Sequence, residues 1–295
     1  MKTAFKPLHD QVIVIADASN SIGLATARMA ADRGAKTVLC SPHFEELKKF
    51  AHEIELSGGR AFAVECDVSN PDSVENAASA ALDRFGRIDT WVNNASHVLY
   101  GKLWDIPLRE KRRLFDVNFW GVVHGCRSAV KAMRESGGVI INVGSIFSDR
   151  AVPTHGMYSA SQHAVKGYTN ALRAEIDAEE FPIAVTMVKP APVEAPFFEP
   201  MHHTPAFAPE LVADAILDSA EHPKRDVIVG TSAMFYSFIK NRPFERRRES
   251  SVSESLRPLA ASIVATGLGL AAAAGIGFAL KRSQSTEPDQ TGLRH

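Results

Sequence analysis

Ser145, Tyr158 and Gln162 are the side chains whose types and spacing come closest to proton-transfer chemistry. Ser145 follows an apolar, strand-like run over residues 139–143, and Tyr158 comes 13 positions later, near the start of a helical pattern over residues 157–180. Tyrosine has an ordinary pKa of about 10, so at neutral pH it is a poor base unless a nearby cation favours the phenolate. Position i+4 lies one helical turn away on the same face, and here it holds the neutral Gln162.

Two cations of the same helix are poorly placed to supply that charge. Lys166 is eight residues from Tyr158, or about 12 Å along the helix axis, which places it two turns away. His163 follows Gln162 directly, so its side chain points about 100° away around the helix. General acid–base help is typically worth about 10²–10⁴-fold in rate, so we expect a partial loss of activity.

Seven short apolar runs, separated by helix-length segments, supply the elements that must position these side chains. The helical patterns include residues 23–33, 71–85, 108–134 and 157–180. Strands that alternate with helices and are apolar throughout favour a parallel sheet covered on both faces. We therefore predict an α/β fold, a doubly wound parallel sheet, in one domain over residues 1–240. The runs that read as buried strands are 12–15, 37–40, 61–64, 90–92, 139–143, 183–188 and 226–229.

Several stretches together resemble the short-chain dehydrogenase/reductase family over roughly residues 8–230. The resemblance implies a Rossmann-like sheet and hydride transfer between NAD or NADP and a small alcohol or carbonyl compound. It also implies a homodimer or homotetramer built on the two long helices. The stretches that carry it are residues 16–23, 67–68, 93–96, 116–121, 142–145, 157–166 and 189–196.

The resemblance assigns roles to individual residues. Asn118 would bend its helix and hold a water in the proton path, Ser145 would hydrogen-bond the substrate oxygen, and Tyr158 would transfer the proton. Gln162 stands where the family has its lysine; it can still hydrogen-bond a cofactor ribose. The residues implied to contact the cofactor are Ala16, Ser19, Ser21, Ile22, Gly23, Asp67, Val68, Asn94, Ala95, Pro190 and Val193.

The loop of residues 16–23 departs from the family's glycine-rich pattern. Glycines there serve the tight turn, the approach of the pyrophosphate and the packing of helix on strand. Only Gly23 remains, because Asp17 and Ser21 stand at the other two places. Aspartate tolerates a positive φ, so the turn can form, and the helix N-terminus still offers amides to an anion. The Asp17 carboxylate near a phosphate is expected to cost about 1–4 kcal/mol, so a decayed ligand site is the alternative.

Other parts of the expected cleft say less about specificity. Residues 40–43 offer neither an acid for a ribose hydroxyl nor an arginine for a 2′-phosphate, which leaves NAD and NADP both open. Ala195 replaces a threonine that in the family touches the nicotinamide. The apolar side chains at 197, 198, 201 and 207 suit either a substrate lid or packing on the sheet. His202 and His203 form no metal site, because no third ligand is indicated.

Composition excludes several classes of partner. The formal net charge is −1, which gives no case for nucleic acid binding. Three scattered cysteines are too few for a disulfide framework or a metal site, which favours a reduced compartment. No apolar run follows the N-terminal lysines, so a cleaved signal peptide is not expected.

The C-terminal region changes character. Residues 241–257 read as a basic, solvated linker, residues 258–280 as a transmembrane anchor, and residues 281–295 as a polar tail. The run from 259 to 280 has no charge and is long enough to span a bilayer. Positive charge is heavier on its N-terminal side, so the folded domain is expected to face the cytoplasm. A soluble Ala-rich helix and a disordered tail are the alternatives.

Two functions follow from these observations. One is a membrane-tethered oxidoreductase with weak or altered activity. The other is a non-catalytic binding or scaffold protein, favoured by the changes at Asp17, Ser21, Gln162 and Ala195. A structural, membrane-associated oligomer is a third possibility.

Overall fold

The computed structural model describes residues 5–151, 153–191 and 207–230. The predicted linker, membrane anchor and polar tail (residues 241–295) lie outside these residues, as do Val193, Ala195 and the histidine pair at 202–203. Within the described ranges, no helix has both the length and the apolar character needed to cross a bilayer.

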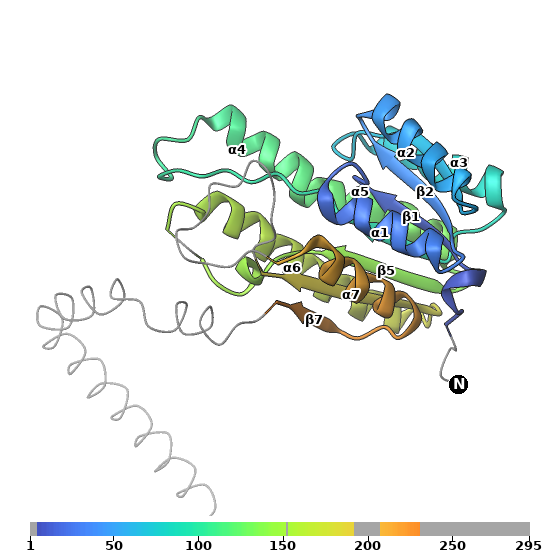
Figure 1. The fold of residues 1–295 in the computed structure, drawn as a ribbon. Coiled ribbons are helices and arrows are strands. Elements are labelled where there is room, and N and C mark those ends of the chain that lie inside the picture. The colour runs from blue at the N-terminus through green and yellow to red at the C-terminus, as the bar shows by residue number, and fades with distance from the viewer. Residues whose placement is uncertain (1–4, 152, 192–206, 231–295) are drawn as a thin grey trace, which may run out of the picture. The chain divides into compact units, whose positions relative to one another are not determined.

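Seven parallel strands form one sheet in the order β3-β2-β1-β4-β5-β6-β7 (Figure 1). This confirms the predicted doubly wound sheet, and each predicted strand lies within an observed one. The strands are β1 (Val12–Ala16), β2 (Lys36–Ser41), β3 (Arg60–Glu65), β4 (Thr90–Asn93), β5 (Gly138–Val143), β6 (Ile183–Pro190) and β7 (Asp226–Val229).

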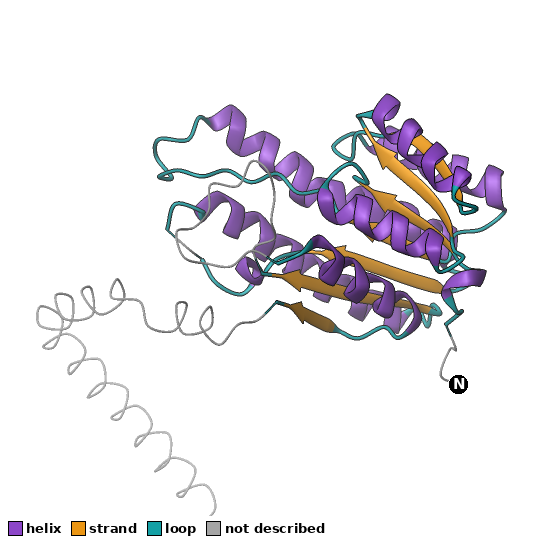
Figure 2. Ribbon diagram, viewed as in Figure 1, coloured by secondary structure: helices purple, strands orange, loops and turns teal. Residues whose placement is uncertain are grey.

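Helices cover both faces of the sheet (Figure 2). Helices α1, α2 and α7 bury their apolar side chains on one face, and α3, α5 and α6 bury theirs on the other. The α-helices are α1 (Ser21–Asp32), α2 (Phe44–Leu56), α3 (Pro71–Phe85), α4 (Leu108–Phe115), α5 (Gly121–Met133), α6 (Gly156–Ala178) and α7 (Pro209–Glu221). Short helices of other types are η1 (Leu8–Asp10), η2 (Asp116–Trp120) and η3 (Ile146–Ser148).

The predicted helix over residues 108–134 contains a local irregularity. It is a continuous helical stretch in which η2, a π-helix, joins α4 to α5. Asn118 lies in the middle of this π segment and is buried. Single π turns inside α-helices are rare and are frequent at functional sites.

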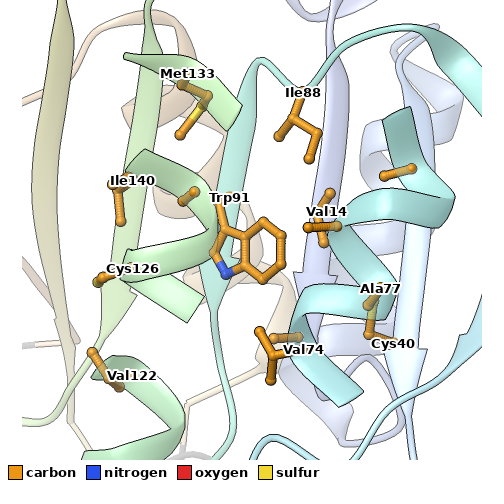
Figure 3. Packing of buried hydrophobic residues seen from close by; sticks show 14 of the residues in the cluster. Val14, Cys40, Val74, Ala77, Ile88, Trp91, Val122, Cys126, Met133 and Ile140 are labelled. Atoms are coloured by element: carbon orange, nitrogen blue, oxygen red, sulfur yellow. The ribbon is translucent and has the colours of Figure 1, made fainter. Parts of the chain in front are cut away.

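The core on the α3/α5/α6 face is organised around Trp91 of β4, which lies between side chains of α3 and of α5 (Figure 3). Its indole Nε1 donates to Asn93 Oδ1 at 2.8 Å, and Asn93 Nδ2 donates to Asn142 Oδ1 on β5 at 2.8 Å. Helix α5 approaches this pair closely at Gly125, where an added Cβ would lie 1.9 Å from Asn93 Oδ1. These buried hydrogen bonds link β4 to β5 near the carboxyl ends of both strands.

The strand order reverses between β1 and β4. Chain connections leave β1 toward β2 on one side and reach β4 on the other, so the loops after these two strands diverge. In open α/β sheets ligands bind at this switch point, outside the carboxyl ends of the strands.

Candidate active site

Tyr158 and Ser145 meet at the carboxyl edge of the sheet. Ser145 follows β5, Tyr158 lies in the first turn of α6, and both are buried, at 7% and 8% exposure. The hydroxyl-bearing side chains of Ser96 and Ser145 neighbour the Tyr158 hydroxyl closely enough to affect its pKa. The ring of Phe147 packs edge-to-face against the tyrosine at 5.8 Å between centroids. Burial raises the pKa of Tyr158, and the two hydroxyl partners lower it by less.

Asn118 joins the loop after β4 to the start of α6. Its Nδ2 donates to the His97 carbonyl at 2.9 Å and to Ser161 Oγ at 3.1 Å, and its Oδ1 accepts from the His97 amide at 2.6 Å. Ser161 Oγ in turn donates to the Tyr158 carbonyl at 2.8 Å. This chain of contacts ties the backbone of His97 to the start of α6.

Gln162 lies one turn after Tyr158 and is 2% exposed. Its Oε1 has no hydrogen-bond partner among the described residues. A Cβ added to Gly144 would lie 3.3 Å from this oxygen, so the amide group is directed toward the end of β5. Since buried amide oxygens are normally paired, this one is an open acceptor beside the hydroxyl pair.

The other cations of α6 have partners elsewhere. Lys166 Nζ pairs with Asp149, which also accepts from Lys189 Nζ at 3.2 Å. His163 Nδ1 lies 2.7 Å from the Ser159 carbonyl oxygen. The expectation that neither replaces the missing charge therefore agrees with the geometry.

A cleft of about 440 Å³ lies at the switch point, within the usual range of ligand sites of about 300–1,000 Å³. Segments after β1, β2, β3 and β4 form its walls together with one side of the helix that carries Asn118. The lining residues are Asp17, Ser19, Asn20, Pro42, His43, Glu46, Asp67, Val68, Ala95, Ser96, His97, Arg113 and Val117.

Asp17 adopts the conformation that the missing glycine would supply. Its φ is 61°, and its carboxylate accepts from Ser19 Oγ at 2.8 Å and Asn20 Nδ2 at 2.9 Å. Asn20 Oδ1 caps α1 by accepting from Gly23 N at 2.9 Å. A Cβ added to Gly23 would lie 2.5 Å from the Asp17 carbonyl oxygen. Gly23 thus permits the close packing of helix on loop, while Ser21 begins the helix.

The remaining residues predicted to contact the cofactor lie along the carboxyl edge of the sheet. Ala16 ends β1, Ile22 lies in the first turn of α1, and Pro190 ends β6. Asn94 Nδ2 donates to the Asp17 carbonyl at 2.8 Å, while its buried Oδ1 has no partner among the described residues. Asn94 therefore ties the β4 loop to the loop after β1.

Asp67 and Val68 form the wall after β3. Burial alone would raise the pKa of Asp67, but hydrogen bonds from Ser69 and the guanidinium of Arg113, 3.6 Å away, lower it below its usual value. Val68 packs against Gly121, where an added Cβ would lie 2.9 Å from its Cγ2. The carboxylate therefore stays charged at the mouth of the cleft.

The sequence prediction missed several lining residues. Arg113 and Val117 are four residues apart, and both face the cleft; that spacing on one helix face was the available signal. Glu46 lines the cleft from α2, beyond the segment 40–43 in which an acid was sought. Ser96 stood in a motif already recognised but carried no assigned role.

The site fits a dinucleotide. Its cleft lies where the strand order reverses, its volume is sufficient, and two buried amide oxygens, Gln162 Oε1 and Asn94 Oδ1, have no hydrogen-bond partner among the described residues. The fold and the site together define a Rossmann-type oxidoreductase.

Comparisons with known proteins agree with this class. A sequence model of the family described as short chain dehydrogenase matches residues 11–206. The chain is 42% identical over 244 residues to the Bacillus subtilis protein described as uncharacterized oxidoreductase YxnA, covering 79% of this chain and 68% of that protein. The chain therefore belongs to the short-chain dehydrogenase family.

Two solved structures share the fold. An alcohol dehydrogenase from Thermococcus sibiricus, complexed with 5-hydroxy-NADP, superposes with a TM-score of 0.68 at 25% identity, covering 74% of this chain and 95% of its own. A short-chain dehydrogenase/reductase from Burkholderia phymatum in complex with NAD gives a TM-score of 0.72 at 22% identity, covering 85% and 96%. The second likeness concerns the fold alone.

Proposed function

We propose that this chain transfers hydride between NAD or NADP and a small alcohol or carbonyl compound, with low activity. The observation that carries the proposal is the placement of Ser145 and Tyr158, both buried, at the carboxyl edge of the sheet, where Ser145 lowers the pKa of Tyr158. A bound nicotinamide would supply or accept the hydride. Ser145 would hold the substrate oxygen by a hydrogen bond, Tyr158 would donate or accept the proton, and their burial would exclude bulk water.

Two features limit the expected rate and affinity. Burial raises the pKa of Tyr158, and Gln162 supplies no charge to oppose that rise. Asp17 places a carboxylate in the cleft where a pyrophosphate would approach. Its two hydrogen bonds within the loop hold the carboxylate in position, so binding of an anion is weakened.

A non-catalytic binding or scaffold role is the second candidate. It is favoured by Gln162, whose amide is buried and directed toward Gly144. A protein of this kind keeps the sheet and the cleft but does not turn over substrate.

Cofactor-binding and turnover assays on the full-length protein distinguish these two functions. We expect saturable binding of NADH or NADPH, and turnover with a panel of short alcohols and aldehydes that Tyr158→Phe abolishes. Tyr168→Phe on the same helix is the matched control, because Tyr168 packs against Phe119 away from Ser145. Cofactor binding with no turnover supports the scaffold role, and equal activity of Tyr158→Phe and the control refutes the proposed chemistry.

We also propose that residues 258–280 anchor the chain in a membrane, with the folded domain on the cytoplasmic side. The support is the uncharged run of spanning length with heavier positive charge before it. Deletion after Arg257 is expected to move the protein from the membrane pellet to the supernatant. Retention of the truncated protein in carbonate-washed membranes contradicts the anchor.

Oligomers are common in the family, which suggests a homodimer or homotetramer for this chain as well. Light scattering of the full chain in detergent measures this directly. A mass of one chain at all concentrations contradicts the expectation.

A further inference from the structure

Three carboxylates line the cleft, and one of them lies on the wall where NADH and NADPH would differ. They belong to Asp17, Glu46 and Asp67. Glu46 is exposed and lies in the first turn of α2, shortly after β2. Resting on the proposed function, we propose that Glu46 determines cofactor specificity: its carboxylate repels the 2′-phosphate of NADPH, so the cleft binds NADH in preference.

The fold sets the position of Glu46 relative to a dinucleotide. In Rossmann-type sheets the pyrophosphate lies at the N-terminus of the first helix, and the ribose 2′-oxygen is recognised about 20 residues further on. In this chain β2 ends at Ser41, and the cleft-lining residues that follow it are Pro42, His43 and Glu46. NADPH carries a phosphate on that oxygen, which adds a charge of about −1.5 to −2 at pH 7. Glu46 therefore places a carboxylate on the wall that the added phosphate would approach.

The serine hydroxyls on this wall already donate their protons within the protein. The His43 amide donates to Ser41 Oγ at 3.1 Å, and Ser41 Oγ donates to Ser19 Oγ at 2.8 Å. Ser19 Oγ in turn donates to Asp17 Oδ1 at 2.8 Å. Each hydroxyl has a single proton, so this chain of hydrogen bonds ends on a carboxylate and leaves neither serine with a proton to donate to a phosphate.

The guanidinium of the cleft is held at a different wall. Among the described residues, Arg113 is the only lysine or arginine that lines the cleft. Its guanidinium lies 3.6 Å from Asp67 Oδ2 and donates to Ser69 Oγ at 2.8 Å. These contacts hold its charge at the segment after β3, where Asp67 balances it. The guanidinium therefore does not offset the charge of Glu46 beside β2.

The N-terminus of α2 also favours NADH. Helix N-termini attract anions, and the side chain of the N-cap residue, His43, caps none of the amides of this helix. However, Glu45 and Glu46 both lie in the first turn, where carboxylates interact favourably with the helix dipole. A 2′-phosphate would therefore compete with two negative charges for the same end of the helix.

Calorimetric titration of the full-length protein with NADH and with NADPH tests the preference without requiring turnover. His43 and His97 also line the cleft, so the titrations are done at about pH 8, where imidazoles are ordinarily neutral. NADH should bind at least about tenfold more tightly than NADPH. Glu46→Gln keeps the side-chain volume and should narrow the ratio of the two dissociation constants at least about threefold, and Glu46→Lys at least about tenfold, mainly through tighter binding of NADPH.

Glu45 provides the matched control. It is exposed and lies in the same first turn of α2, but it is not among the residues that line the cleft. Glu45→Gln and Glu45→Lys make the same changes of net charge at the same helix end, and they should leave the ratio of dissociation constants unchanged. Equal shifts at positions 45 and 46 would overturn the inference, because net charge or the helix end would then set the preference.

The titrations separate this inference from the function on which it rests. Equal affinity of the native protein for the two dinucleotides, or tighter binding of NADPH, overturns the inference and leaves the proposed hydride transfer standing. A preference for NADH that Glu46→Lys does not change overturns it as well, because another residue then sets the specificity. Binding of neither dinucleotide at millimolar concentration removes the proposed function and the inference with it.

Discussion

Gln162→Lys restores a positive charge one helical turn from Tyr158 and tests whether the missing ammonium limits the reaction. At about 4 Å and an effective dielectric constant of about 20, an ammonium favours the phenolate by up to about 4 kcal/mol. That energy equals about three pKa units. The position is 2% exposed, so desolvation of the new charge opposes part of this gain. We therefore expect the pKa of Tyr158 to fall by about one to three units.

The assay is the rate of alcohol oxidation as a function of pH, with the cofactor saturating. The rising limb should move to lower pH, and the rate at neutral pH should increase at least about tenfold, since each unit is a factor of ten. Gln162→Met is the matched control: it fills a similar volume without charge and should leave the limb in place. Both variants need a cooperative thermal transition, because position 162 is part of the core.

The pH dependence of the two variants can refute a role for charge at position 162. If Gln162→Lys is folded and binds cofactor but has the same pH dependence as Gln162→Met, charge at this position does not control Tyr158. Burial and the neighbouring Ser96 and Ser145 side chains then determine the pKa of Tyr158.

Three further predictions concern packing, cofactor affinity and acid stability. Gly125→Ala should lower the free energy of unfolding by about 1–3 kcal/mol in denaturant titrations, because the added Cβ meets Asn93 Oδ1; Gly167→Ala, with nothing within 4 Å, should be neutral or stabilising, and equal losses in both would contradict the packing argument. Asp17→Asn should keep the left-handed turn and tighten NADH binding at least about fivefold by removing about 1 kcal/mol or more of repulsion; unchanged affinity in calorimetry would count against that repulsion. Burial would raise the pKa of Asp149, but two lysine ammonium groups outweigh it and lower the pKa. Its stabilising effect is therefore present above the unfolded pKa of about 3.9 and lost as pH falls through the lower folded pKa. Asp149→Asn should therefore flatten the acid side of the curve of unfolding free energy against pH. An unaltered curve would show that other carboxylates dominate.

The sheet could be predicted from the sequence because buried parallel strands are apolar along their whole length. Each of the seven runs, from residues 12–15 to 226–229, coincides with an observed strand. The start of α3 was also encoded locally: Asn70 caps the helix by accepting from Asp72 N, and Pro71 occupies the first helical position.

The environment of Tyr158 could be predicted only in part. Ser145 and Tyr158 follow from motif spacing, but the position of the loop after β4 depends on Asn118 binding the backbone of His97, 21 residues away. Contacts of this range arise from the tertiary fold and leave no periodic pattern in the sequence.

The ion pair of Lys166 could also be predicted only in part. The position of Lys166 on α6 indicated that it lies too far from Tyr158, because helix geometry sets that distance. Its partner, Asp149, lies before the helix and also serves Lys189 of β6. Such a partner is not apparent from the sequence, since three separate elements have to converge to create the pair.

Calorimetric titration of the full-length protein with NADH and with NADPH tests most directly whether this cleft serves an oxidoreductase. We expect saturable binding of at least one of them in the millimolar range or tighter, and stronger binding by Asp17→Asn. If neither dinucleotide binds at millimolar concentration, in the native protein or in Asp17→Asn, this cleft does not serve an oxidoreductase.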